Sequence, residues 1–272
     1  MNYYAAEIYP VSQMYLSVGE KMPYEHVFRM LRESGYNGWE GVLDLPEETA
    51  SYMPLLKKSG LEMRSAYMNV VLHDQSRAED EIKRVLNRAE EYAPQGLECL
   101  LVNPMPLDWI NPVAKNEEQL DIQLENINTL GHELRKRGVT LSYHSHDMEM
   151  LNGAKEMLHM LSASDEQAVS WCFDPEWIAK GSGNGGMAPL DWARIFGHRV
   201  TVIHYRQAVK GISCQVTCDG DIDYRGIQTI LESKGASPLL VNEQLPGNLK
   251  EAFPVRDKLY TDSLTYIKSI FG

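Results

Sequence analysis

The sequence predicts an α/β fold in which eight parallel strands, each followed by a helix, close into a (β/α)8 TIM barrel. Short apolar runs alternate with amphipathic segments along the chain, which is typical of parallel strands covered by helices. Eight such units match the closure of a barrel, and 272 residues are enough for one. No stretch rich in Pro, Gly or Ser divides the sequence, so we expect a single barrel domain over residues 1–272.

Strands are expected where short runs rich in β-branched or apolar residues occur. In chain order these runs cover residues 8–16, 37–43, 61–67, 97–103, 139–144, 169–173, 200–204 and 238–242. Helices are expected in the amphipathic segments, several of which stop at a glycine such as Gly35, Gly60 or Gly138. These segments cover residues 24–34, 47–59, 76–92, 116–137, 154–162, 190–196, 223–233 and 251–270. An open doubly wound sheet would be expected to carry a glycine fingerprint after its first strand, whereas residues 17–20 contain one glycine, Gly19.

Charge and composition disfavour several kinds of partner. The chain has a net charge of −12 and a pI near 5.2. Its longest basic cluster is Arg135-Lys136-Arg137, so it lacks the concentrated positive face that tight nucleic-acid binding needs. No run approaches ~20 apolar residues, and the N-terminus lacks the residue order of a signal peptide. We therefore expect a cytoplasmic protein without a nucleic-acid or membrane partner, and homo-oligomerisation is left open.

Ionisable side chains stand where four of the expected strands end. Asp174, His204 and Glu243 each follow an apolar run, and Tyr-His-Ser-His-Asp-Met-Glu at 143–149 follows another. A parallel barrel places all these strand ends on one face, so the side chains can converge there. Each one alone could cap a helix or make a local hydrogen bond. Their recurrence at several strand ends predicts a metal site.

Three side chains compete for the fourth corner of this site. His144 and His146 are two residues apart, so they point to the same face of an extended strand, and Glu149 lies just beyond them. Only some of these groups can bind one ion. An imidazole that does not bind the ion could instead act as a general base, because it titrates near working pH.

These residues also resemble the motifs of a known family. Tyr-His-Ser-His-Asp-Met-Glu-Met at 143–150 is similar to the Tyr-His-Asn-His-Asp-Phe-Glu-Phe segment of the sugar phosphate isomerase/epimerase family, the xylose isomerase-like barrels. Further matches follow in the family's order: Gly-Tyr-Asn-Gly-Trp-Glu at 35–40, Phe-Asp-Pro-Glu-Trp at 173–177, Ile-His-Tyr-Arg at 203–206, Gly-Asp-Ile-Asp-Tyr at 220–224 and Val-Asn-Glu-Gln at 241–244. Together the matches span almost the whole chain.

The resemblance implies one divalent metal ion, commonly manganese, bound by Glu149, Asp174, His204 and Glu243. Oxygen-rich ligands of this kind suit manganese or magnesium, with cobalt or zinc as alternatives. This assignment leaves His146 as an acid/base group.

The resemblance also implies a small carbohydrate substrate. The residues expected to contact it are Arg206, His144, Glu40, Trp177 and Trp109. The family usually has Lys where this chain has Arg206, whose planar guanidinium suits a carboxylate, phosphate or enediolate oxygen. The two tryptophans could pack against the apolar face of a sugar ring.

The activity that the resemblance implies is that of a divalent-metal-dependent sugar isomerase or epimerase, acting on a ketose or keto-sugar through a metal-stabilised enediolate. Glu149 or Glu243 would double as ligand and base, with His146 as a second proton carrier. The alternative is a metal-dependent dehydratase or lyase on a keto-inositol or 3-keto-glycoside, because the same enediolate can expel a hydroxyl or a glycosidic leaving group. A non-catalytic sugar-binding barrel is disfavoured because no ligand is lost. An abasic-site endonuclease is disfavoured because it would carry His where Trp177 stands.

Overall fold

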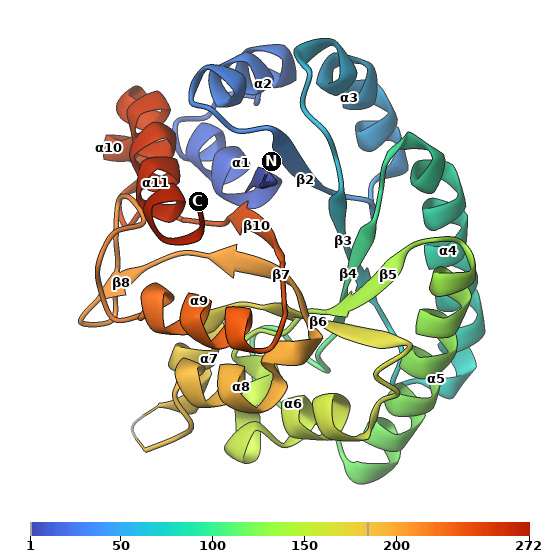
Figure 1. Cartoon of the computed structure of the whole chain (residues 1–272). Coiled ribbons are helices and arrows are strands. Elements are labelled where there is room, and N and C mark those ends of the chain that lie inside the picture. The colour runs from blue at the N-terminus through green and yellow to red at the C-terminus, as the bar shows by residue number, and fades with distance from the viewer. Residues whose placement is uncertain (1, 184) are drawn as a thin grey trace.

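The computed structural model describes residues 2–183 and 185–272, and it shows a closed barrel of eight strands surrounded by helices (Figure 1). The strands are β1 Tyr4–Glu7, β2 Gly38–Val42, β3 Ser65–Val70, β4 Cys99–Pro104, β5 Thr140–Tyr143, β6 Val169–Phe173, β7 Val200–Tyr205 and β10 Leu239–Asn242. Around the barrel they follow the order β1, β10, β7, β6, β5, β4, β3, β2, and all neighbours are parallel. The predicted TIM-barrel fold is confirmed.

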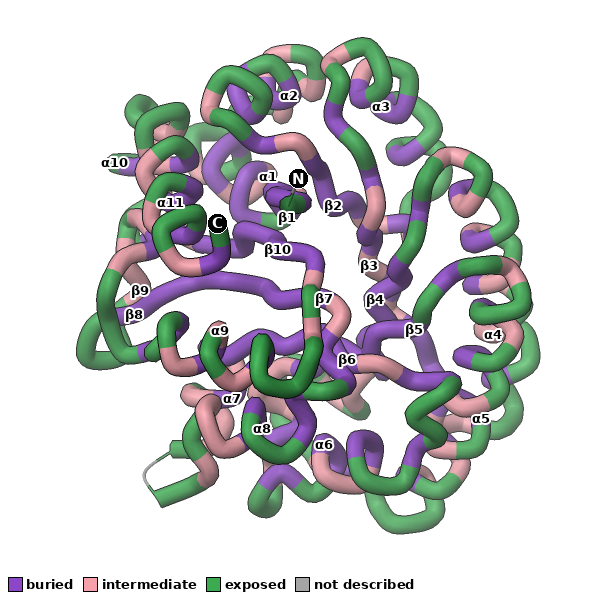
Figure 2. Tube along the Cα trace, in the orientation of Figure 1, coloured by how far each residue is buried: buried purple, intermediate pink, exposed green. Residues whose placement is uncertain are grey.

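The helices cover the outside of the barrel. They are α1 Ile8–Ser17, α2 Tyr24–Glu33, α3 Pro46–Ser59, α4 Gln75–Tyr92, α5 Glu117–Lys136, α6 Leu151–Ala163, α7 Pro175–Ser182, α8 Pro189–Phe196, α9 Tyr224–Ser233, α10 Leu249–Ala252 and α11 Arg256–Phe271. Figure 2 shows the strands mainly buried, while the outer turns of the helices are exposed. Between β7 and α9, β8 Ala208–Val209 and β9 Ile212–Ser213 form a small antiparallel hairpin. No helix in the described part of the chain is both long and apolar enough to cross a lipid bilayer.

The predicted first strand at 8–16 is wrong, because this segment forms helix α1 and the first strand is the short β1 before it. Several buried side chains of α1 have helical spacing: Val11, Met14 and Tyr15. A spacing of three and four residues places them on one face of a helix. The carboxylate of Glu7 begins the helix by accepting a hydrogen bond from the N–H of Tyr9 at 2.7 Å.

Two other elements differ from the sequence prediction. Strand β3 begins at Ser65, so the strand predicted at 61–67 lies too early in the chain. Helix α7 was not predicted, although its start has clear signals. Asp174 caps it by accepting hydrogen bonds from two backbone N–H groups, and Pro175 occupies the first helical position.

The alternation of side chains along the strands determines which residues reach the mouth of the barrel. A small apolar cluster inside the barrel includes Leu101, Cys172, Val202 and Val241. Successive side chains on a strand point to opposite faces, so the residue two positions later points inward again. Two positions after these four residues stand Asn103, Asp174, His204 and Glu243. The sequence therefore directs these polar side chains to the carboxyl end of the barrel, where barrel enzymes hold their active sites.

Candidate metal centre

Four side chains at the carboxyl end of the barrel offer metal-binding atoms to one region. His144, Asp174, His204 and Glu243 each provide one such atom, and these atoms all lie within 4.8 Å of one another. They come from the ends of β5, β6, β7 and β10, which are consecutive around the barrel. All four residues are buried. Two carboxylates and two imidazoles form a donor set that suits a divalent transition metal.

His144 fits a metal ligand particularly well. Both of its ring nitrogens are buried without a hydrogen-bond partner among the described residues. Leaving a buried polar group without a partner costs about 1–3 kcal/mol. Burial, followed by the nearby His146, lowers the pKa of His144 well below its ordinary value, so the ring is neutral and able to bind a metal.

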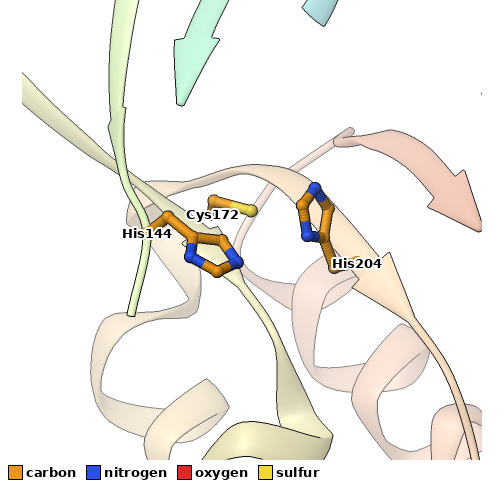
Figure 3. A group of neighbouring side chains, drawn as sticks. All are labelled: His144, Cys172 and His204. Carbon is orange, nitrogen blue, oxygen red and sulfur yellow. The ribbon is translucent and has the colours of Figure 1, made fainter. Parts of the chain in front are cut away.

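Cys172 lies between the two imidazoles of this group. Figure 3 shows His144 and His204 on opposite sides of the Cys172 side chain, and the ring centroids of the two histidines are 5.0 Å apart. The three residues form a second group with metal-ligand atoms close together. Burial raises the pKa of the Cys172 thiol to about 12, so the thiol keeps its proton. The carboxylates are therefore better ligands than this sulfur.

His204 lies between two carboxylates. Its Nε2 is 2.7 Å from Oε1 of Glu40, and its Nδ1 is 2.8 Å from Oε2 of Glu243. Burial is the largest influence on the pKa of His204 and acts to lower it, but Cys172, Glu40 and Glu243 together raise it well above its ordinary value. The contact with Glu40 fixes the orientation of the ring. Carboxylates commonly hold a metal-binding histidine in this way.

Arg206 supplies positive charge to the same cluster. Its Nη2 lies 2.8 Å from Oδ2 of Asp174, its Nε lies 3.1 Å from Oε2 of Glu176, and its Nη1 lies 3.6 Å from Oε1 of Glu243. The guanidinium also stacks 4.4 Å from the ring centroid of Trp177. Arg206 thus balances acidic groups that would otherwise repel one another in a buried site.

The two acids of the group have different protonation preferences. Burial raises the pKa of Asp174 to about 7, although Arg206 opposes this effect. Burial also acts to raise the pKa of Glu243, but Arg206 and His204 outweigh it and hold that pKa well below its ordinary value. Glu243 is therefore the more firmly ionised of the two.

Glu149 lies outside the group of four. Its Oε2 accepts a hydrogen bond from the backbone N–H of His146 at 2.6 Å. Its pKa is raised to about 7 by burial and then by Glu156, while Lys115 acts in the opposite direction. Lys115 and Glu156 themselves form a buried ion pair at 2.6 Å. At the fourth corner the structure thus places His144 beside the other three side chains and uses Glu149 to hold the backbone at His146.

A cavity of about 510 Å³ opens above these side chains. Seven of the sequence-predicted site residues line it: Trp109, His144, His146, Trp177, His204, Arg206 and Glu243. Glu40 does not line the cavity and contacts His204 instead. The ring of His146 packs with its centroid 5.3 Å from that of Trp109 and 5.2 Å from that of Trp177. Four of the five predicted substrate residues therefore surround one space, and Glu40 is the exception.

Several residues of the site were not predicted from the sequence. Glu7 is the last residue of β1 and lines the cavity, and it was missed because the first strand was placed after it. Glu176 contacts Arg206 and was recognised only as part of a motif. Asn69 and Asn103 stand at strand ends like the ionisable groups, but a neutral amide gives no charge signal in a sequence.

Together the parallel barrel and the group of carboxylates and imidazoles at its carboxyl end define the class of fold. The chain has the fold of the xylose isomerase-like TIM barrels. Solved structures of this class match it over nearly its whole length. A sugar phosphate isomerase/epimerase from Parabacteroides distasonis has a TM-score of 0.74 and 17% identity, over 97% of this chain and 98% of that one.

Two other solved structures illustrate the range of similar proteins. A D-psicose 3-epimerase from Clostridium cellulolyticum, solved with D-tagatose, has a TM-score of 0.71 and 10% identity, over 99% of each chain. A xylose isomerase-like TIM barrel protein from Mycobacterium smegmatis, solved in complex with magnesium, has a TM-score of 0.68 and 14% identity, over 97% of this chain and 98% of that one. At these identities the similarity establishes the fold.

Curated relatives are found at low sequence identity. An inosose dehydratase from Geobacillus kaustophilus is 21% identical over 199 residues, which cover 70% of this chain and 63% of that protein. An inosose dehydratase from Clostridium perfringens is 20% identical over 254 residues, which cover 83% of this chain and 84% of that protein. No family model matches the sequence.

Proposed function

We propose that this chain is an enzyme that binds one divalent metal ion and moves a proton beside the carbonyl group of a ketose or keto-sugar. The observation that carries the proposal is the buried group of His144, Asp174, His204 and Glu243, with both nitrogens of His144 lacking a protein partner. These four side chains would hold the ion, with manganese or magnesium favoured. When bound, the ion would polarise the carbonyl and an adjacent hydroxyl of the sugar and so acidify the neighbouring C–H bond.

The residues around the cavity have separate roles in this proposal. His146 carries the proton, because it lines the cavity but does not belong to the group of four. Glu243 is the second proton carrier. Arg206 binds a substrate oxygen, and Trp109 and Trp177 pack against the sugar ring.

Isomerisation or epimerisation is the first candidate outcome. It requires one group to remove a proton and another to return it. His146 follows β5 and Glu243 follows β10, and β6 and β7 separate these two strands in the barrel. The two groups therefore approach the cavity from different sides, as epimerisation requires.

Elimination of water or of a glycosidic group is the second candidate outcome. One observation favours it. The curated relatives are inosose dehydratases, although at only 20–21% identity. A substrate of this kind would be a keto-inositol or a 3-keto-glycoside.

Metal content tests the first part of the proposal. We expect the purified protein, grown with manganese, to contain about one metal ion per chain, and the Glu243→Gln variant to contain much less. Elemental analysis measures both, and Glu98→Gln is the matched control, since Glu98 pairs with Arg64 on the surface. Wild-type protein that remains free of metal in replete medium would favour a non-catalytic sugar-binding barrel.

Solvent deuterium exchange tests the reaction. A panel of ketoses, keto-inositols and 3-keto-glycosides would be incubated with the protein in deuterated water. Deuterium in a stereoisomer of the substrate indicates isomerisation or epimerisation, whereas release of water or of the aglycone indicates elimination. If no compound of the panel exchanges a proton, the proposed substrate class is wrong.

A further inference from the structure

A chain of hydrogen-bonded side chains crosses four neighbouring segments at the barrel mouth and ends on His146. Nδ1 of His146 lies 3.1 Å from Oδ1 of Asn103. Nδ2 of Asn103 donates to Oδ1 of Asn69 at 3.1 Å, and Nδ2 of Asn69 donates to Oδ2 of Asp44 at 3.0 Å. We call Asp44, Asn69 and Asn103 the amide relay. Its members follow or belong to β2, β3 and β4, and His146 follows β5.

The strand pairing sets the relay geometry. Asn69 and Asn103 are direct partners in the register of β3 and β4, so their side chains leave the sheet side by side. Asn103 is fully buried, and Asn69 and Asp44 are partly buried. The contacts are therefore held by the barrel itself.

Asp44, at the end of the relay away from His146, determines which group donates and which accepts in each hydrogen bond. Oδ1 of Asp44 accepts a hydrogen bond from Nη1 of Arg84 at 2.8 Å. A carboxylate paired with a guanidinium is an acceptor at both oxygens. Oδ2 of Asp44 accepts two bonds from Asn69, one from its backbone N–H and one from its side-chain amide, each at 3.0 Å. The amide nitrogen of Asn69 must therefore face Asp44.

Once Asn69 is oriented, the donor and acceptor of the other two hydrogen bonds, Asn69 to Asn103 and Asn103 to His146, are also determined. Its Oδ1 faces Asn103 and also accepts a hydrogen bond from the hydroxyl of Tyr67 at 3.3 Å. If Asn103 were flipped, two amide oxygens would meet at about the 3.1 Å that now separates a donor from an acceptor. Asn103 must therefore direct Nδ2 at Asn69 and Oδ1 at His146. Because Oδ1 only accepts, Nδ1 of His146 must carry a hydrogen.

We infer that the amide relay fixes the tautomer of His146, so that Nδ1 permanently holds a hydrogen and Nε2 is the nitrogen that exchanges protons with the substrate. The inference rests on the proposed role of His146 as proton carrier and makes Asn103, Asn69 and Asp44 positioning residues for it. The ring nitrogen bonded to a fixed partner determines which nitrogen is available for chemistry. Free histidine favours the opposite tautomer, with the hydrogen on Nε2, so the relay holds a form that the ring would not choose alone.

Other contacts keep the ring where the relay can act. The backbone N–H of His146 is held by Glu149, and the ring faces Trp109 and Trp177. This gives Glu149 a role in the site without direct contact with the ion: it fixes the loop after β5, while the relay fixes the proton.

Nitrogen-15 NMR of the histidine rings tests the inference without any substrate. The full chain would be labelled and measured with magnesium, a diamagnetic ion, and the signals of His146 would be assigned by their loss in His146→Gln. We expect wild-type His146 to show the hydrogen on Nδ1. We expect Asn103→Leu, which removes the acceptor at similar size, to shift the ring to the Nε2–H form. We expect Asn103→Asp to restore Nδ1–H, because a carboxylate also accepts from this nitrogen, although the hydrogen bond from residue 103 to Oδ1 of Asn69 is lost.

Turnover provides the second readout. We expect Asn103→Leu to lower kcat by about 10- to 100-fold at nearly constant KM and metal content, with partial recovery in Asn103→Asp. Wild-type protein with the hydrogen on Nε2 would overturn the inference, even if Asn103→Leu failed to fold. A tautomer shift without any change in turnover would leave the relay standing and reject His146 as the proton carrier, so the two proposals fail separately.

Discussion

On the side of the barrel mouth formed by β6, β7 and β10, ionisable groups contact one another directly, whereas on the side formed by β3 and β4 the contacts run through neutral amides. On the first side Arg206 contacts Asp174 and Glu243, and Glu243 in turn contacts His204. Asn69 and Asn103 connect Asp44 to His146 on the second. The first side is buried and the second is partly buried, and the two sides also differ in how they compensate their polar groups.

The difference shows which property each side can control. Charge attraction depends on distance and has little directional preference. On the charged side we therefore expect a metal ion to be able to take the place of the Arg206 guanidinium beside the carboxylates. Amide hydrogen bonds depend on the orientation of donor and acceptor, so the amide side can determine where a hydrogen sits. We therefore expect substitutions on the charged side to change metal binding, and substitutions near the amide side to change turnover with the metal still bound.

The largest effect on metal binding and turnover is expected at the strand-5 corner, the segment after β5 that carries His144, His146 and Glu149. The two sides of the barrel mouth meet there. We expect His144→Gln to lose the metal ion and to lower turnover by roughly 10³-fold, because an ion of this kind contributes several kcal/mol to the transition state. We expect Glu149→Gln to keep the ion, since its amide can still accept the hydrogen bond from His146. Elemental analysis and turnover measurements on both variants decide whether His144 or Glu149 binds the ion. Retained metal in His144→Gln with loss in Glu149→Gln would reverse the assignment of this corner.

His146 tests the amide side. Replacing His146 with Asn or Gln should leave the metal bound but lower kcat by about 100-fold, because general acid–base groups typically contribute this much. His132→Gln is a suitable control, since His132 pairs with Asp165 at the surface. Unchanged turnover would remove His146 from the mechanism. Loss of metal in the His146 variants would show that His146 also binds the ion, and the two sides would then not have separate roles.

The sequence could predict the barrel and three members of the group, because both depend on continuous buried runs. Val200–Tyr205 is such a run, and its end places His204 at the mouth. The ends of β6 and β10 place Asp174 and Glu243 by the same alternation. The first strand could not be recognised, since β1 has four residues and the apolar helix α1 follows it directly. That error concealed Glu7.

The strand-5 corner could not be resolved from the sequence for a geometric reason. Strand β5 ends at Tyr143, and a short 3₁₀ helix, Met148–Met150, follows within a few residues. Alternation therefore directs His144 inward but says nothing about His146 or Glu149. The amide relay was equally hidden, since its meaning depends on which strands are neighbours and on the orientation of each amide.

Substitution of Glu40 is expected to have a smaller effect on metal binding. Glu40 contacts Nε2 of His204, so in the proposed site Nδ1, beside Glu243, would bind the ion. We expect Glu40→Gln to weaken manganese binding by about 10-fold, as loss of a partner that orients a metal-binding histidine usually does. Titration calorimetry measures the affinity. Unaltered affinity would mean that the barrel alone holds the ring of His204.

Arg206 gives the smallest expected effect, and its sign is opposite to that of Glu40. The guanidinium contacts both Asp174 and Glu243, so an entering cation must compete with it for these carboxylates. We expect Arg206→Gln to bind manganese about three- to tenfold more tightly, equivalent to about 0.7–1.4 kcal/mol, while KM for the sugar rises. Arg194→Gln is the matched control, because Arg194 pairs with Asp191 at the surface. Weaker metal binding in Arg206→Gln would show that Arg206 is needed to position Asp174 and Glu243. The guanidinium and the metal ion would then not compete for these carboxylates.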